Sequence, residues 1–444
     1  MHSNQDFFLY TRPSRLFFKA SIPGAIGMIA SNIYFSLEML LIGRLIGQTA
    51  FAAGNLALPL ILINFALADM VAVGSSVRIA IRLGEGETES ANRIFTTAVA
   101  TAMLLSLLTS LILIAACPLL FSLMGADTSL LDDATVYLRT YAAFCPITCL
   151  VFVFDNYLRI CGRVRFSMVM NIVMSLLCLL FEFIFLYVLN LGIAFAALGT
   201  SLGMSIACII CAWPFIRGRL ALRFVRVRPS LSTLSDIFAQ GLPNFLNNIS
   251  GKITSILMNS LLLRWGGDIA VSIYGVFMNI DGIIVPGMYG VFDSLQPAIG
   301  YNWGAERKDR VRRIALYCVI AIAVMCIAFT VLLLAFPGGI FSLFLHTDSV
   351  SLELAIHAIT IMAFTYLVRW INYACQSFSS AIGNNKEATV LSICSALVFP
   401  LLMMLVLQNF QLDGIWLVTP SAAFLTSIVA IVIYFVQIRR VVRD

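Results

Sequence analysis

The chain has 444 residues, of which 61% are hydrophobic and only 11% are charged. An ordinary soluble domain has about 25% charged residues, so this chain lacks the polar surface that a soluble globular protein needs. The composition therefore predicts a protein whose solvent is lipid. The net charge of +6 comes from short Lys and Arg clusters between apolar segments. Such clusters are typical of loops that face anionic lipid headgroups, and they do not indicate a nucleic-acid partner.

Apolar segments long enough to cross a bilayer follow one another along the chain, and we expect no cleavable signal peptide before them. The predicted spans lie near 15–42, 52–81, 93–120, 134–160, 166–189, 194–216, 236–263, 270–300, 313–341, 354–381, 388–408 and 414–437. Several exceed the roughly 20 residues that one crossing needs. Prolines such as Pro23, Pro146 and Pro286 fall inside these spans, so we expect tilted and kinked helices.

Loop charges predict the orientation. If the N-terminus is cytoplasmic, the inner loops hold 22 of the 28 Lys and Arg residues, and the outer loops hold only Arg44 and Arg264. Cytoplasmic loops are the ones enriched in Lys and Arg. We therefore expect both termini in the cytoplasm and an even number of spans, in a plasma membrane and specifically a bacterial inner membrane.

The sequence repeats itself at an offset of 220 residues. Pro23 matches Pro243, Arg44 matches Arg264, and Gly84 matches Gly304. The predicted fold is an all-α polytopic membrane protein with twelve transmembrane helices in two six-helix lobes, related by pseudo-twofold symmetry along the membrane normal. The predicted lobes are 1–216 and 234–444, joined by a basic cytoplasmic linker at 217–233. Two such lobes enclosing a cleft are typical of a transporter, not of an enzyme.

The eleven cysteines lie almost entirely in apolar runs, and their number is odd, so we expect no disulfide framework. Cys208 and Cys211 form a CxxC pair inside a helix without a second ligand pair, which favours packing over a metal site. The sequence thus predicts neither a metal centre nor a cofactor.

Charged side chains inside the membrane are costly and indicate function by default. Some have structural interpretations. Asp155 and Arg159 are four residues apart and are expected to pair, and Arg78 can reach the interface with its long side chain. Lys252 is expected to pair with Asp281 or Asp293, and such a pair could also line the cleft. The side chains that we expect at the substrate cleft are Asp69, Lys252, Asp281, Asp293, Gln296 and Arg369.

Glu38 and Glu182 differ from these charges because neither glutamate has a basic residue within four positions along its helix. A buried carboxylate without a cation can take up and release protons near neutral pH, or it can bind a hard cation such as Na⁺. We therefore predict that both glutamates couple transport to an ion.

Several motifs resemble the multidrug and toxic compound extrusion (MATE) family over nearly the whole chain. Glu38 precedes Gly43, Gly47 and the alanines at 50, 52 and 53 in a pattern similar to the family's first-helix signature. The segment 296–305, QPAIGYNWGA, is the most specific match, and Gly414-Ile415-Trp416 resembles the start of the family's last helix.

The resemblance implies antiport, in which small amphipathic organic compounds, often cations, leave in exchange for H⁺ or Na⁺. In the branch that couples through the N-terminal lobe, Glu38, Glu182 and Thr200 fall on positions of the coupling site. Cys178 stands at an asparagine position of that site, and both acids are Glu where Asp is usual. The missing oxygen ligand at Cys178 favours H⁺ over Na⁺. The other branch uses an acid on the seventh helix, where this chain has Lys252.

The resemblance thus predicts a secondary active multidrug efflux antiporter that works by alternating access, as a monomer, with small-molecule substrates, the coupling ion and membrane lipids as its partners. One alternative is a lipid-linked saccharide flippase of the same superfamily, against which the surplus of acids argues. A major facilitator transporter is disfavoured by the loop RLGEGETESANR at 82–93, and a membrane-embedded enzyme by the lack of a catalytic motif.

Overall fold

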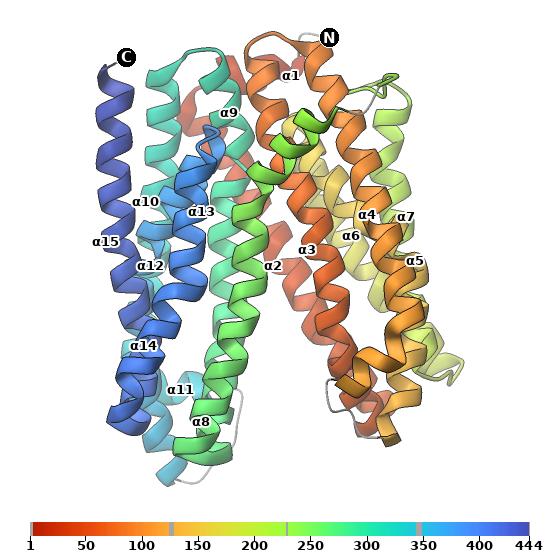
Figure 1. Cartoon of the computed structure of the whole chain (residues 1–444), viewed down its shortest axis with the longest axis vertical. Coiled ribbons are helices and arrows are strands. Elements are labelled where there is room, and N and C mark those ends of the chain that lie inside the picture. The colour runs from red at the N-terminus through yellow and green to blue at the C-terminus, as the bar shows by residue number, and fades with distance from the viewer. Residues whose placement is uncertain (1–2, 124–127, 228–229, 343–348, 444) are drawn as a thin grey trace. The chain divides into compact units, whose positions relative to one another are not determined.

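The computed structural model describes residues 3–123, 128–227, 230–342 and 349–443, and every regular element in these ranges is helical (Figure 1). The first part of the chain forms α1 (Ser3–Tyr10), α2 (Pro13–Leu45), α3 (Gln48–Gly84), α4 (Thr88–Leu123), α5 (Thr128–Ile160), α6 (Val164–Phe183), η1 (Ile184–Val188) and α7 (Ile193–Ile216). The second part forms α8 (Leu231–Asp293), α9 (Gln296–Gly304), α10 (Lys308–Ala335), α11 (Pro337–Ser342), α12 (Ser349–Ala381), α13 (Asn385–Ile393), η2 (Cys394–Val398), α14 (Phe399–Leu407), η3 (Gln408–Phe410) and α15 (Gln411–Arg443).

Ten helical stretches of the described residues are long and apolar enough to cross a membrane. Two of them are long enough to cross twice, because Leu231–Gly304 has 74 residues and Asn385–Phe435 has 51, against roughly 20 for one crossing. The first is broken at Gly267, where φ is 65°, and the second at Gln411, where φ is 56°. Residues with positive φ interrupt right-handed helix. The breaks give twelve spans and confirm the predicted fold class.

The helix ends correct one predicted span. The single crossing predicted at 313–341 is α10, which ends at Ala335, and the last residues of the predicted span form the short helix α11 from Pro337. Proline has no backbone N–H and disfavours helical conformation in the residue before it. The local sequence around Pro337 therefore explains why α10 ends here.

The chain folds into two compact units. Unit 1 comprises the residues up to Gly241 together with Gly300–Arg307, and unit 2 comprises Leu242–Ile299 together with the residues from Lys308 onward. Helices α8 and α9 thus contribute residues to both. The predicted lobes, 1–216 and 234–444, were defined by the sequence repeat, whereas these two units are defined by contacts between residues. The predicted lobes therefore stay a prediction. Two residues of the predicted linker, 228 and 229, lie outside the described residues.

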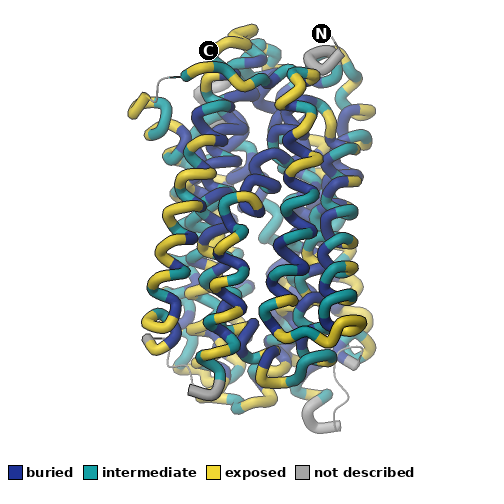
Figure 2. The backbone as a smooth tube through the Cα atoms, turned by 90° about the vertical axis from the view of Figure 1, so that its right-hand side faces the viewer, coloured by how far each residue is buried: buried dark blue, intermediate teal, exposed yellow. Residues whose placement is uncertain are grey.

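In unit 1, helices α3, α5 and α7 form the inner layer. At least half of the most apolar stretch is buried in each of these three helices, against 28% in α2 and α4. Figure 2 shows buried and exposed stretches along the backbone of the whole chain. Small residues line much of α3, where its fully buried members include Ala53, Ala57, Ala68 and Ala72. Because lipid offers no hydrophobic drive for association, helices in membranes gain stability from the close backbone approach that small residues allow.

The repeat glycines Gly84 and Gly304 meet at one such approach inside unit 1. A Cβ atom on Gly84 would lie 2.2 Å from the carbonyl oxygen of Tyr301, and one on Gly304 would lie 2.1 Å from that of Ile81. Both distances are far below van der Waals contact, so only glycine allows the ends of α3 and α9 to touch.

Helix α1 was not predicted. Its residue Phe8 is fully buried, and the side-chain amide of Asn302 donates to the Phe8 carbonyl at 3.1 Å. The guanidinium of Arg307 donates to the Leu9 carbonyl at 2.7 Å. These bonds satisfy backbone groups at the C-terminal end of α1, which have no partner within so short a helix.

In unit 2, α12 packs against α10 and α15, and α14 packs against α15. Helix α12 supplies polar side chains that form hydrogen bonds within this unit, including Tyr366, Arg369, Tyr373 and Ser377.

Candidate functional site

Four helices of unit 1 bring two acids and three hydroxyl groups together in the protein interior. Glu38 lies on α2, Glu182 near the end of α6, and Thr200 on α7, and all three side chains are buried. Tyr34 lies one turn before Glu38 on the same helix, and Tyr137 comes from α5. We refer to these five residues as the acid cluster.

Thr200 is the centre of the acid cluster. Its Oγ1 lies 3.0 Å from Oε1 of Glu38 and also forms a short contact with Oε1 of Glu182. The Tyr34 hydroxyl lies 2.9 Å from the Thr200 hydroxyl and 3.3 Å from Oε1 of Glu182. The Tyr137 hydroxyl donates to Oε1 of Glu38 at 3.1 Å. The two acids thus share one hydroxyl, and the structure brings together the residues predicted to form the coupling site.

Two glycines on α7 let it approach α6 closely enough for these contacts. A Cβ atom on Gly203 would lie 2.6 Å from the backbone nitrogen of Cys178, and one on Gly199 would lie 2.9 Å from that of Glu182. Directly after Glu182, the π-helical turn η1 replaces regular helix. Such turns occur often at functional sites, because one extra residue changes the direction of the side chains around it.

The acid cluster contains no side chain that can supply a positive charge. Two ionised carboxylates buried together would repel each other and would lack the solvation that water gives. A cation from solution, H⁺ or Na⁺, removes this cost.

The number of hydroxyl hydrogens in the cluster also indicates that it needs a proton or another cation. The cluster has five close oxygen–oxygen contacts among the described residues, whereas Tyr34, Tyr137 and Thr200 have one hydroxyl hydrogen each. A proton on one carboxyl group would supply a further donor. The second oxygen of Glu182, Oε2, is also buried without a hydrogen-bond partner among the described residues.

Cys178 is buried beside the cluster, one turn before Glu182. Its thiol lies 3.4 Å from the backbone carbonyl of Thr200 and contacts neither acid in the described geometry. A sodium ion prefers oxygen ligands, which the carboxylates and hydroxyls of the cluster offer and the sulfur does not. The donor set therefore suits a proton, and it offers Na⁺ one oxygen fewer than an asparagine in place of Cys178 would.

Asp155 belongs to a separate network with a structural role. Its carboxylate pairs with Arg159 at 2.7 Å, as predicted, and accepts a hydrogen bond from Asn171 at 2.9 Å and another from Ser167. The Arg159 side chain is only 4% exposed, so the pair is buried. Breaking a buried ion pair by removing one partner leaves an uncompensated charge.

The predicted cleft residues of unit 2 form two smaller groups. Oδ1 of Asp281 accepts bonds from Arg369 at 2.7 Å and from Tyr366 at 2.8 Å. The described partner of Asp281 is therefore Arg369 and not Lys252, and the alternative pairing of Lys252 with Asp293 stays a prediction. Lys252 lies on an exposed part of α8.

Asp293 forms the second group. Its Oδ1 accepts bonds from Tyr373 at 2.8 Å and from Ser377 at 3.0 Å. Gln296 is half-buried at the start of α9 in unit 2, and Asp69 is half-buried on α3 in unit 1.

Two members of the acid cluster were missed in the sequence. Tyr34 carried a signal, because a residue four positions before Glu38 lies on the same helix face. Tyr137 carried none, since it is 99 residues from the acid that it contacts. Among the described residues, no group of three or more His, Cys, Asp or Glu side chains is arranged to hold a metal ion.

Comparison with known proteins identifies the family. The family model described as MatE matches residues 23–184 and 243–405. The two matches begin 220 residues apart, which is the offset of the internal repeat. Together they cover more than half of the chain, so this protein belongs to the MatE family and is an integral membrane protein.

Relatives resemble the chain over most of its length, and solved structures share its fold. "Multidrug export protein MepA" of Staphylococcus saprophyticus is 23% identical over 94% of this chain and 93% of its own length. The protein of the same name from Staphylococcus haemolyticus is 24% identical over 89% and 87%. The "Crystal structure of MATE in complex with MaL6" has a TM-score of 0.93 at 22% identity and covers 100% of both chains. The "Outward-facing conformation of a multidrug resistance MATE family transporter of the MOP superfamily" has a TM-score of 0.92 at 22% identity and covers 99% of both.

Proposed function

We propose that this protein is a multidrug exporter that moves small amphipathic organic cations out of the cell in exchange for protons. The observation that carries the proposal is the acid cluster, in which Glu38 and Glu182 share the hydroxyl of Thr200 in a buried site without a cation. The MepA relatives, which are named multidrug export proteins, support the substrate class. No enzymatic step is part of this proposal.

The coupling mechanism follows from the electrostatics of the cluster. Protonation of one glutamate relieves the repulsion between the acids and supplies a hydrogen bond donor, which stabilises one conformation of the cluster. Loss of that proton restores the repulsion and favours another conformation. A ligand that distinguishes two states shifts their populations by the difference in its affinity for them. A proton gradient can thereby drive the cycle, and coupling would run through the N-terminal lobe.

Sodium is the competing ion, and a saccharide flippase is the competing function. The cluster offers Na⁺ carboxylate and hydroxyl oxygens, but Cys178 removes one oxygen ligand. The MatE match and the names of the relatives favour drug export over the flippase.

The test is efflux from proteoliposomes that contain the purified protein and a fluorescent amphipathic cation. We expect efflux when a pH gradient is imposed at constant Na⁺, and no efflux with a Na⁺ gradient at constant pH. Efflux that requires Na⁺ and ignores the pH gradient would refute the choice of ion. Drug resistance and efflux assays in cells without their own pumps, across cationic, neutral and anionic compounds, test the substrate class. Resistance to none of them would refute multidrug export.

We further propose that the termini are cytoplasmic, that the protein lies in a bacterial inner membrane, and that it acts as a monomer. The arginine-rich segment before α8 carries the orientation. A cysteine introduced at the exposed Ser232 of a cysteine-free variant should not react with an impermeant thiol reagent in intact cells. Labelling from outside would refute the proposed orientation.

A further inference from the structure

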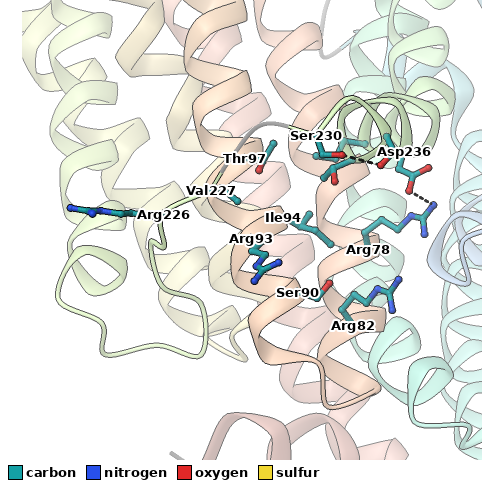
Figure 3. A pocket seen from close by; sticks show the side chains of 13 residues that line it. Arg78, Arg82, Ser90, Arg93, Ile94, Thr97, Arg226, Val227, Ser230 and Asp236 are labelled. Carbon is teal, nitrogen blue, oxygen red and sulfur yellow. Dashed lines mark hydrogen bonds and ion pairs between the residues drawn. The ribbon is translucent and has the colours of Figure 1, made fainter.

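A cavity of about 600 Å³ lies inside unit 1, between α3, α4 and the segment that leads into α8 (Figure 3). Four arginines, one aspartate and five hydroxyl side chains line it. Arg78 and Arg82 come from α3, one turn apart, and Arg93 comes from the second turn of α4. Figure 3 shows that the fourth arginine, Arg226, is directed away from these three. The cavity is therefore a basic site built by three arginines.

Two of the three arginines, Arg82 and Arg93, form ion pairs near the protein surface. Arg82 lies 2.9 Å from both Glu85 and Glu87, and Arg93 lies 2.5 Å from Glu89. These side chains are between 36% and 79% exposed. Exposed ion pairs contribute little to stability and exchange readily with other partners. None of the three glutamates lines the cavity.

Arg78 has the least exposed side chain of the three, at 34%. It pairs with Asp236 at 3.0 Å, and its Nε is buried without a hydrogen-bond partner among the described residues. The pairing takes one guanidinium nitrogen and leaves other N–H groups for a ligand. Asp236 is the only acid among the cavity-lining residues. The lining itself is thus positive.

The hydroxyl groups complete a site whose hydrogen-bond donors suit a phosphate group. Ser90 lies between the α3 and α4 arginines in sequence, and Ser232 and Thr233 approach from the first turn of α8. Guanidinium groups bind the oxygens of a phosphate through paired N–H donors, and hydroxyls add single donors. The apolar side chains of Ile94 and Ile237 also line the cavity. They offer contact to an uncharged part of the same ligand.

We propose that this cavity binds the phosphate group of an anionic ligand, supplied either by a membrane phospholipid or by a soluble phosphate. The cavity lies beside the C-terminal end of α3 and the N-terminal end of α4. The ends of membrane-spanning helices lie near the lipid headgroups. Basic pockets at this depth bind anionic headgroups. The site is distinct from the acid cluster, and its occupancy does not depend on transport.

The test is thermal unfolding of the full-length protein in neutral detergent with three probes at constant ionic strength. The probes are short-chain phosphatidylglycerol, short-chain phosphatidylcholine and inorganic phosphate, with sulfate as the salt control. The double variant Arg82→Gln/Arg93→Gln removes two arginines at exposed positions. Each arginine contributes about fivefold in affinity for an anionic headgroup, so we expect the double variant to lose about twenty-five-fold. The matched control is Arg163→Gln/Arg165→Gln, which removes two exposed arginines outside the cavity lining.

A second variant keeps all the arginines. Ser232→Glu places a carboxylate at the exposed mouth of the cavity and should abolish binding, even if the arginine double variant fails to fold. Stabilisation by phosphatidylglycerol alone identifies a lipid, and equal stabilisation by inorganic phosphate but not sulfate identifies a soluble phosphate. The proposal is overturned if phosphatidylglycerol, phosphatidylcholine and phosphate act alike, or if Ser232→Glu binds as the wild type does.

Discussion

Oγ1 of Thr200 donates to Oε1 of Glu38 across 3.0 Å, although the two residues are 162 positions apart in the chain. The same oxygen touches Glu182. A single hydroxyl hydrogen cannot serve both acids. Whatever proton or ion occupies the cluster therefore decides which acid Thr200 serves, and this is the physical basis of the proposed switch.

The first prediction concerns the acids. Glu38→Gln and Glu182→Gln each remove one charge and keep the shape of the side chain, so each should abolish efflux driven by a pH gradient while leaving expression and folding largely intact. Proteoliposome efflux is the measurement. Glu353→Gln is the matched control, because Glu353 is exposed on α12. Full-rate efflux by both glutamine variants would refute the coupling site.

The second prediction concerns the tyrosine that sequence inspection missed. Tyr137→Phe removes the donor to Glu38, and a hydrogen bond to a charged group contributes about 1.5–3 kcal/mol. We expect a fall in the efflux rate of at least about tenfold. Tyr187→Phe, at a side chain that is 59% exposed, should have no effect. Equal rates for the two variants would show that Tyr137 does not act on Glu38.

The third prediction tests the close contact of α6 and α7. Gly203→Ala would place a methyl group 2.6 Å from the Cys178 backbone, so the helices must separate and Thr200 must move from Glu182. We expect loss of efflux together with a lower melting temperature, since overpacking typically costs about 1–3 kcal/mol. Gly282→Ala is the control, because nothing lies within 4 Å of a Cβ atom there. A Gly203→Ala variant as stable and active as this control would contradict the packing.

The fourth prediction separates structure from coupling. Asp155→Asn leaves the buried Arg159 without its carboxylate, and breaking a buried pair costs about 3–5 kcal/mol. The variant should therefore unfold at a lower temperature, while the molecules that remain folded keep their dependence on the pH gradient. Efflux normalised to folded protein is the measurement. Loss of coupling at unchanged stability would place Asp155 in the mechanism instead.

The fifth prediction concerns α1. Arg307→Gln removes the bond to the Leu9 carbonyl and the contact of the guanidinium with the Tyr10 ring, whose centre is 4.8 Å away. The amides of residues 3–10 should then exchange hydrogen faster, because local opening is easier where fewer contacts hold a segment. Arg313→Gln serves as the control at an exposed arginine of α10. Unchanged exchange in the Arg307 variant would mean that other contacts hold α1.

The sequence by itself determined the class of fold and the two acids. Spans could be predicted because a helix in lipid must satisfy its own backbone and present about 20 apolar residues, which is a local and one-dimensional requirement. Glu38 and Glu182 could be singled out because a charge in such a run is costly wherever it lies. The Asp155–Arg159 pair was also predictable, because four residues along a helix return to the same face.

Only the tertiary structure decided which side chains meet. Tyr137 joins the acid cluster, and Arg369 rather than Lys252 neutralises Asp281. These outcomes depend on how far each helix is turned and how closely it approaches its neighbours, which small residues such as Gly203 set by letting backbones touch. Contacts between side chains of different helices arise from packing across long sequence separations, and no local pattern in a single sequence records them.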